Sequence, residues 1–213
     1  MANIFKPEII RKEKLILAEG DDDCYFLLNL LSKMKIDDVQ ISCIGGVENL
    51  THHIEAIKRM DGFDNVTSIL IFRNSEESTE SACESINNSL KKTEIINTDI
   101  TPFIMSYQNN RKIGFVLFPG IDENGQIYKY GTLEHLCLQL FKEKSVKEKV
   151  KTYIDDFQLK TKNFSKLHKN ELYATFSFTD SFVGLKIGET AKAEGFDFDS
   201  PHLSPFIKII NEM

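Results

Sequence analysis

The chain has 213 residues, of which 41% are hydrophobic, so it can bury a full core within one domain. It has no apolar run of about eighteen residues, and charged residues occupy its start, where a signal peptide needs an apolar stretch; we therefore expect a cytoplasmic protein that is neither secreted nor membrane-spanning. A formal net charge of -6 argues against general phosphate neutralisation as the way of binding nucleic acid, so any such contact must be local or bridged by a metal ion.

The first predicted unit is a strand followed by a helix. Residues 14–19 form an apolar run of strand length that stops at Gly20 and three aspartates. From Asp22 onward, leucine and methionine side chains recur at helical spacing, and aspartates occupy the first turn, where the helix dipole favours negative charge. The pattern predicts a buried strand that ends at the surface and leads into an amphipathic helix.

Strand and helix patterns then alternate as far as residue 90. A second strand is predicted over 39–43, a turn at Gly45-Gly46, a helix over 47–60, a third strand over 66–72, a polar stretch over 73–80 and a helix through 90. The third strand is continuously apolar, as in a sheet that is buried on both faces. This alternation predicts an α/β fold with a mainly parallel, Rossmann-like sheet flanked by helices.

The second half begins with a predicted hairpin and continues with helical patterns. Residues 102–107 and 112–118 have strand character and flank the turn-forming Gln108-Asn109-Asn110, so we expect an antiparallel hairpin at one edge of the sheet. A polar loop then leads to Gly131. We predict an α/β core over 1–142 and a helical C-terminal extension over 143–213, packed on the same domain.

The four cysteines are predicted to be reduced core thiols. They lie far apart in apolar or helical contexts, at Cys24, Cys43, Cys83 and Cys137, with no C-x-x-C pair and no clustered histidines. Neither a disulfide framework nor a zinc site is expected.

Acidic side chains follow the first strand at the sheet edge where open α/β folds bind their ligands. If residues 19–23 approach one helical turn, Glu19 and Asp23 come onto one side, and a hard cation such as Mg²⁺ can stabilise crowded carboxylates. The alternative is ordinary helix capping by Asp22 with solvated neighbours, which the spacing alone favours.

A second polar group follows the third strand. If the two strands are neighbours, Asn74 and Glu76 would lie beside Glu19 and could offer a carbonyl oxygen and a carboxylate to one ion. The alternative is that this segment, rich in serine and glutamate, is only the start of a helix. The segment considered by itself favours that alternative. Glu134, near the start of a later predicted helix, needs only the helix dipole to explain it.

Other charged or titratable residues carry weaker signals. His52 and His53 are adjacent and cannot both face one site from a helix, and His135, His168 and His202 are isolated along the chain. Residues 142–151 alternate in charge sign, which favours a solvated helix face over a nucleic-acid groove.

The order of these features resembles the Toprim domain of topoisomerases, primases and OLD-type nucleases. An apolar strand leads into Glu19-Gly20-x-Asp22-Asp23, and a later strand ends in a D-x-D-like triplet. The closer resemblance is to the stand-alone Toprim-like family DUF3226. The further matches span nearly the whole chain and are Gly45-Gly46 with Asn49-Leu50, Ile113-Gly-Phe-Val-Leu-Phe-Pro119, Gly131-Thr-Leu-Glu134 and Phe196-Asp-Phe-Asp-Ser-Pro201.

The resemblance implies a metal site that binds Mg²⁺ or Mn²⁺. It makes Glu19 a general acid/base or metal ligand and Asp23 a second ligand, and it places Asn74 and Glu76 on the D-x-D pair, with Glu134 as a later acidic residue of the site. The first member of the pair should be an aspartate. An amide keeps the oxygen but loses the charge, which lowers metal affinity and disfavours a two-metal mechanism.

Two functions follow from this resemblance. The first is a metal-dependent nuclease that cleaves DNA or RNA, in defence against phage or plasmids together with an ATPase; since no G-x-x-x-x-G-K-[S/T] occurs, the ATPase would be a separate protein. The second is a Toprim-fold binding or regulatory protein whose metal site has decayed, which Asn74 and the acidic net charge favour. A homodimer is compatible with either function.

Overall fold

The computed structural model describes residues 5, 6, 8–156 and 164–213, with the backbone alone for 164–166. Its strands are β1 (Lys14–Ala18), β2 (Val39–Cys43), β3 (Ser68–Asn74), β4 (Ser106–Gln108) and β5 (Arg111–Phe118). Its α-helices are α1 (Asp21–Met34), α2 (Leu50–Lys58), α3 (Thr79–Lys92), α4 (Leu133–Leu140), α5 (Lys144–Asp156), α6 (Phe164–Ser177), α7 (Ile187–Lys192) and α8 (Ser204–Asn211). None of these helices is both long and apolar enough to cross a membrane.

The strands form one sheet in the order β2-β1-β3-β5-β4. The first four are parallel, and β4 pairs antiparallel with β5 at the edge. The turn between β4 and β5 consists of Asn109 and Asn110, both with positive φ, which is the conformation that two-residue hairpin turns require and asparagine tolerates. The predicted α/β class, the mainly parallel sheet and the edge hairpin are confirmed.

The third strand differs from its predicted range of 66–72. It begins two residues later and continues to Asn74, because β5 supplies a partner for each added residue: Arg73 pairs with Leu117 and Asn74 with Phe118. Asn74 is therefore the last residue of a strand and not the second residue of a loop.

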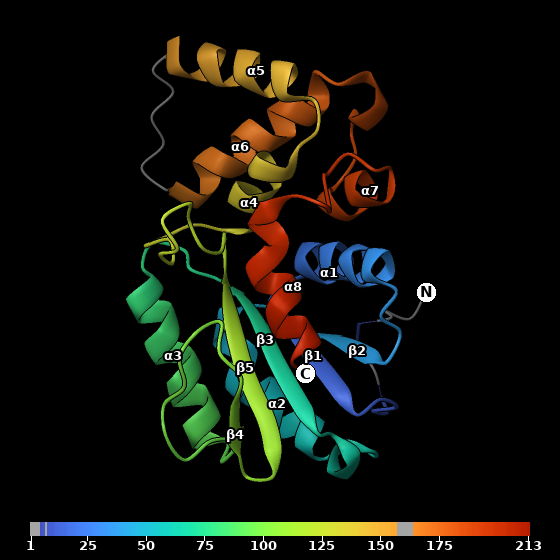
Figure 1. Cartoon of the computed structure of the whole chain (residues 1–213), viewed down its shortest axis with the longest axis vertical. Helices are drawn as coiled ribbons and strands as arrows, with labels where there is room; N and C mark the ends of the chain where they lie inside the picture. The colour runs from blue at the N-terminus through green and yellow to red at the C-terminus, as the bar shows by residue number, and fades with distance from the viewer. Residues whose placement is uncertain (1–4, 7, 157–163) are drawn as a thin grey trace.

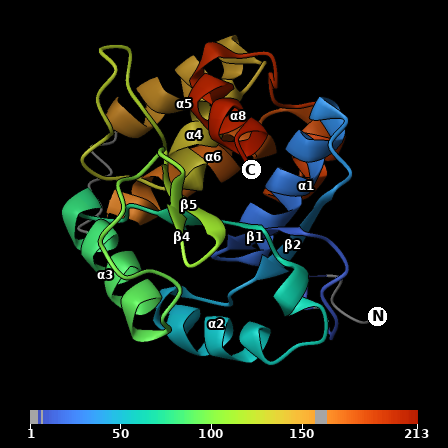
Figure 2. The same cartoon turned by 60° about the horizontal axis from the view of Figure 1, so that its bottom comes forward.

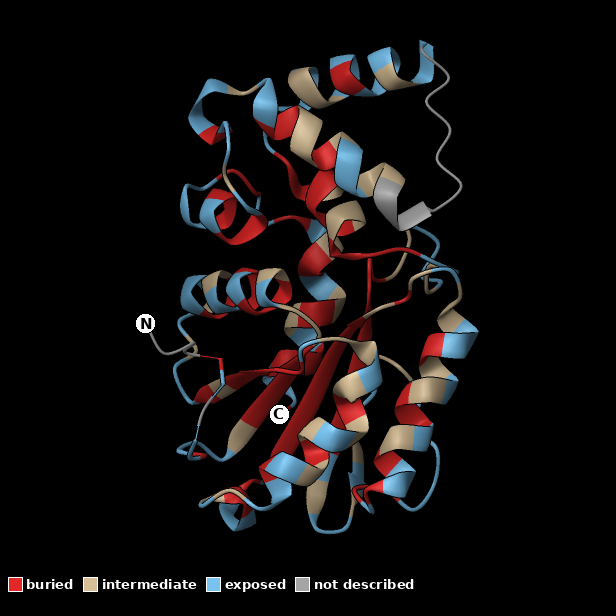
Figure 3. Ribbon diagram, turned by 180° about the vertical axis from the view of Figure 1, so that it is seen from behind, coloured by how far each residue is buried: buried red, intermediate tan, exposed pale blue. Residues whose placement is uncertain are grey.

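Alternate residues of the strands face opposite sides of the sheet, and helices cover both (Figure 2). One face packs against α2 and α3, and the other against α1, α4 and α8. The central strands are buried almost throughout, as Figure 3 shows. Continuous apolar sequence in β3 is thus explained by burial on both faces.

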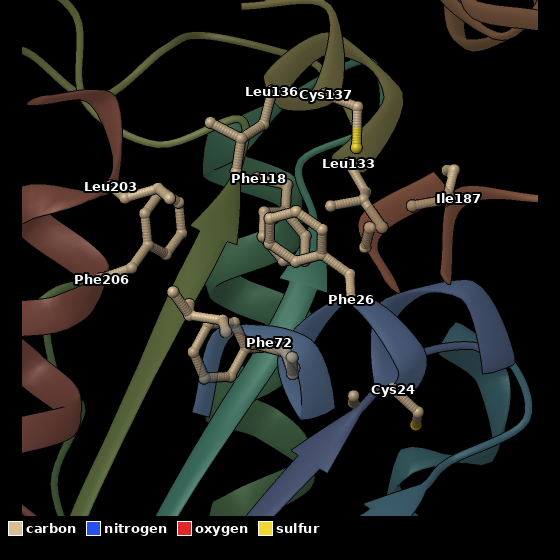
Figure 4. Packing of buried hydrophobic residues seen from close by; sticks show 14 of the residues in the cluster. Cys24, Phe26, Phe72, Phe118, Leu133, Leu136, Cys137, Ile187, Leu203 and Phe206 are labelled. Atoms are coloured by element: carbon tan, nitrogen blue, oxygen red, sulfur yellow. The ribbon is translucent and has the colours of Figure 1, made fainter. Parts of the chain in front are cut away.

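The C-terminal helix α8 lies on the sheet (Figure 1). Its Phe206 ring stacks on Phe72 of β3, with centroids 6.2 Å apart, and contacts Phe118 of β5 at 5.5 Å. Phe26 of α1 meets the same Phe118 ring edge-on, so the aromatic cluster joins both ends of the chain (Figure 4). The helices α4, α5, α6 and α7 lie beyond the carboxyl ends of the parallel strands (Figure 1).

All four cysteines are free, and Cys24, Cys43 and Cys137 are buried, as the sequence predicted, whereas Cys83, also predicted as a core thiol, is only half-buried. Their burial in apolar surroundings raises the pKa of each thiol, because the thiolate is poorly solvated there. These cysteines are therefore inert core residues.

Candidate metal and phosphate site

Glu19 follows β1 at the carboxyl edge of the sheet, beside the end of β3. Its Oε2 accepts a hydrogen bond from the backbone N–H of Asn74 at 3.0 Å. Its carbonyl oxygen accepts from the N–H groups of Gly45 and Gly46, whose φ values of 82° and 121° favour glycine. The expectation that the ends of the first and third strands lie side by side is confirmed, and both neighbouring strand ends hold Glu19 in place.

The start of α1 is capped by Asp23. The capping alternative had named Asp22, and it is wrong in this respect. Gly20 is the N-cap residue, and its backbone N–H donates to Asp23 Oδ2 at 2.9 Å. Asp23 is only 5% exposed, and its Oδ1 is buried with no hydrogen-bond partner among the described residues. A buried carboxylate oxygen without a partner is costly, so this atom calls for an explanation.

Burial and mutual repulsion raise the pKa of four carboxyl groups at this edge. For Asp23 the first cause is burial and the second is the Glu19 carboxylate. Burial is also the first cause for Glu19, Asp22 and Glu76, and Glu134 adds repulsion to all of them. Crowded acids that disfavour one another's ionised form are typical of functional sites.

A cleft of about 440 Å³ is lined by two of these acids, Asp22 and Asp23. It is lined by Gly20, Asp21, Asp22, Asp23, Asn74, Leu133, Glu134, Lys169, Tyr173, Lys186 and Ile187. Glu134 lies at the start of α4 with its side chain 15% exposed, and Lys169 Nζ of α6 approaches its Oε1 to 4.0 Å. A larger hollow, of about 1020 Å³, lies between residues 5–12 and the β2 edge, but none of the strand-end acids lines it. We therefore place the candidate site at the smaller cleft.

The two lysines are the residues that the sequence did not reveal. Lys169 comes from α6, and Lys186 directly precedes α7. Both favour the ionised form of Asp22, which places positive charge near the acidic side of the cleft. Neither lysine has a local pattern that marks it, because each reaches the cleft only through the packing of α6 and α7 beyond the sheet.

Of the two D-x-D positions, only Asn74 lines the cleft. Its Oδ1 accepts from the backbone N–H of Leu133 at 2.8 Å. Glu76 does not line the cleft; its φ is 52°, and its backbone N–H and carbonyl both pair with Gly131 at 2.9 Å. The structure therefore brings Asp23, Asn74 and Glu134 to the cleft, whereas Glu19, which is hydrogen-bonded to Asn74, and Glu76 lie beside the cleft without lining it.

Arg73 supplies a buried cation beneath the acids. It is 9% exposed, and its Nη1 donates to Ser85 Oγ of α3 at 2.9 Å. Its charge opposes the effect of burial on the pKa of Glu19 and of Glu76. An arginine in this strand position thus offsets part of the repulsion at the sheet edge.

The oxygen donors suit Mg²⁺ or Mn²⁺, since these ions accept carboxylate ligands, and the unpartnered Asp23 Oδ1 is one such donor. Within the described ranges, however, no three side chains of histidine, cysteine, aspartate or glutamate converge closely enough to hold an ion. The donor chemistry fits a divalent metal, whereas the side-chain positions do not form a closed coordination shell.

His135 and His168, which are isolated along the chain, lie side by side in the structure. The rings of His135 and His168 stack with centroids 4.2 Å apart, joining α4 to α6. Burial and His168 lower the pKa of His135 to about 4, so it is neutral at pH 7. His53 packs against Ser42, with Nε2 and Oγ 3.0 Å apart. These histidines are packed residues and lie outside the lining of the cleft.

Comparison with known proteins supports the fold. The model of the family described as "Protein of unknown function (DUF3226)" matches residues 13–213. A hypothetical protein from Pyrococcus horikoshii OT3, PH0156, is similar in structure, with a TM-score of 0.54, 14% identity and 95% of each chain covered. The C-terminal region of the OLD protein from Xanthomonas campestris pv. campestris gives a TM-score of 0.48 and 11% identity, over 96% of this chain and 97% of that one. No curated protein matches this chain.

Proposed function

This chain belongs to the DUF3226 family, and from its cleft we propose that it is a divalent-metal-dependent hydrolase of phosphodiester bonds in nucleic acid. One observation carries the proposal: Asp23 is buried with an unpartnered carboxylate oxygen, among acids that raise its pKa. Carboxyl groups whose pKa is strongly perturbed by burial and by neighbouring charges cluster at functional sites. A bound cation would compensate the charge.

The residues of the cleft divide the chemistry between them. Asp23 and Glu134 of the cleft, with Glu19 beside it, would hold Mg²⁺ or Mn²⁺, and such an ion polarises a phosphate and activates water when bound. Lys169 and Lys186, which also line the cleft, supply positive charge for a phosphate. Since the whole chain carries a net charge of -6, this local pair is where a phosphate backbone would be attracted.

Glu19 also has the properties of a proton acceptor. Burial raises its pKa, while the hydrogen bonds from Asn74 and the charge of Arg73 limit that rise. A carboxylate whose pKa moves towards neutrality transfers protons more effectively at the pH of the cell than an ordinary surface carboxylate does. Glu19 is therefore our candidate for general base when it does not bind the ion, in which case Asp23 and Glu134 hold the ion.

Thermal unfolding in divalent metal tests this function. We expect millimolar Mg²⁺ or Mn²⁺ to raise the Tm relative to NaCl of equal ionic strength, because an ion that binds only the folded state stabilises it. Glu19→Gln should abolish the shift and the cleavage of plasmid or single-stranded nucleic acid. Glu77→Gln, an exposed acid that does not line the cleft, is the matched control. Absence of both shift and cleavage in the unmodified protein would refute the proposal.

A second function, a binding module without a metal, is favoured by Asn74. Its Oδ1 already accepts from Leu133, and among the described residues the carboxylates do not converge. This alternative expects no metal-dependent Tm shift, together with binding of single-stranded nucleic acid in EDTA that Lys169→Ala weakens. The same measurements therefore separate the two functions.

A further inference from the structure

Asn74 makes two hydrogen bonds at the junction of β1, β3 and α4. Its backbone N–H donates to Glu19 Oε2 at 3.0 Å, and its Oδ1 accepts from Leu133 N–H at 2.8 Å. The amide side chain also lowers the pKa of the neighbouring Glu19 carboxyl group. Because Oδ1 faces an N–H donor, the other end of the amide is the NH₂ group, which is the end that can donate to Glu19.

The Leu133 contact replaces a missing helix cap. Leu133 is the first residue of α4, and its N-cap residue, Thr132, makes no side-chain capping hydrogen bond. The Thr132 hydroxyl is buried without a partner in the part of the chain that the structure describes. Asn74, 59 positions earlier, therefore satisfies an N–H group that a helix normally satisfies locally.

Backbone pairing next to Asn74 strengthens the same junction. Glu76 and Gly131 exchange two hydrogen bonds of 2.9 Å, and Thr79 N–H donates to the carbonyl of Lys129 at 2.9 Å. The segment after β3 is thus joined to the loop that precedes α4. Since Glu134 is the second residue of α4, these contacts determine where its carboxylate lies relative to Glu19.

We propose that Asn74 is a positioning residue, whose amide joins Glu19 to the start of α4 and so sets the distance between Glu19 and Glu134. An aspartate could accept from Leu133 but could not donate to Glu19, and its charge would face a crowded group of acids. Asn74 is then a required amide and not a lost metal ligand. The inference rests on the proposed function only in assigning a single cation to Glu19, Asp23 and Glu134.

A double-mutant cycle in EDTA tests the amide without any metal. Asn74→Asp should lower the Tm by roughly 5 °C, because a donor is replaced by a repelling acceptor. Glu19→Gln combined with Asn74→Asp should recover most of that loss, since the amide introduced at position 19 can donate to the carboxylate introduced at position 74. Asn88→Asp, the same change at an exposed position of α3, is the control and should leave the Tm unchanged.

Two results would overturn the inference. One is an Asn74→Asp protein as stable in EDTA as the unmodified chain; the other is an Asn74→Asp protein that binds Mn²⁺ more tightly and cleaves nucleic acid faster. We expect weaker Mn²⁺ binding instead, read from the Mn²⁺-dependent Tm shift. If no variant responds to Mn²⁺, the proposed function fails, while the EDTA cycle still decides whether the amide joins Glu19 to α4.

Discussion

At the residue scale, Asp23 combines a structural and a chemical role. One of its oxygens accepts from Gly20 and closes the first turn of α1, while the other is buried among acids without a partner. The sequence places three aspartates in a row, and only one of them caps the helix from within. Which of them becomes buried depends on the exact residue where the helix begins, because a shift of one residue rotates each side chain by about 100°.

The buried carboxyl group of Asp23 predicts a pH dependence of stability. The pKa of Asp23 is higher in the folded than in the unfolded protein. Its contribution to the free energy of unfolding is therefore fully present below the unfolded pKa and is lost as the pH rises through the folded pKa. In EDTA, Asp23→Asn should therefore be more stable than the unmodified protein at pH 8, by on the order of 1–2 kcal/mol, with a smaller difference at pH 5.

Urea unfolding at pH 5 and pH 8 measures this difference. Glu77→Gln serves as the control, because it removes one exposed acid outside the cleft. If the Asp23→Asn protein is less stable than the unmodified protein at pH 8, the prediction is contradicted, because the charge of Asp23 is then compensated without metal. In Mn²⁺ the same variant should lose the metal-dependent gain.

At the element scale, the cleft is built by packing α6 and α7 beyond the sheet edge. The predicted strand ended at Phe72 because arginine and asparagine are poor strand signals, whereas pairing with β5 extends β3 to Asn74. No local pattern indicated that Lys169 and Lys186 would meet there. Helix α6, which carries Lys169, packs on α4, and α7, which follows Lys186, packs on α1; both partners lie far away in sequence.

The close approach of α7 to α1 depends on Gly188. A Cβ atom at this position would lie 2.3 Å from Tyr25 Cβ, and Asn29 Nδ2 donates to the Gly188 carbonyl at 3.3 Å. Gly188→Ala should therefore cost about 1–3 kcal/mol in urea unfolding and displace Lys186 from the cleft. Lys192→Ala, on the exposed side of α7, is the control; equal stabilities of the two variants would contradict the prediction.

At the scale of the whole molecule, the C-terminal helix completes the fold that the N-terminal half begins. Phe206 of α8 packs on Phe72, Phe118 and Phe103, so the sheet face is covered by residues from both ends of the chain (Figure 4). The two faces of the sheet thus depend on different parts of the sequence, one on α2 and α3 and the other on α1, α4 and α8.

Truncation of Phe206 tests this closure. Phe206→Ala should lower the free energy of unfolding by about 3–5 kcal/mol, since it removes a fully buried ring and leaves a cavity. The loss is a large fraction of the 5–15 kcal/mol typical of a folded domain, and urea or thermal unfolding measures it. Lys208→Ala, an exposed position of the same helix, should have little effect. A Phe206→Ala protein as stable as that control would mean that α8 contributes little to the core.

Much of the architecture could be predicted from the sequence. Apolar runs separated by helical periodicity indicated the parallel sheet, and the asparagine turn indicated the edge hairpin. The same patterns placed Glu19 at a strand end. These features depend mainly on neighbours within a few residues, whose apolar spacing and turn chemistry favour one local conformation.

Tertiary structure alone decided how the acidic strand end is used. It buried Asp23 instead of Asp22, bonded Asn74 to both Glu19 and Leu133, and brought Lys169 and Lys186 to the cleft. It also stacked His135 on His168. Each of these outcomes pairs residues from separate elements, and such pairs depend on the packing of whole helices on the sheet, for which a local pattern carries no signal.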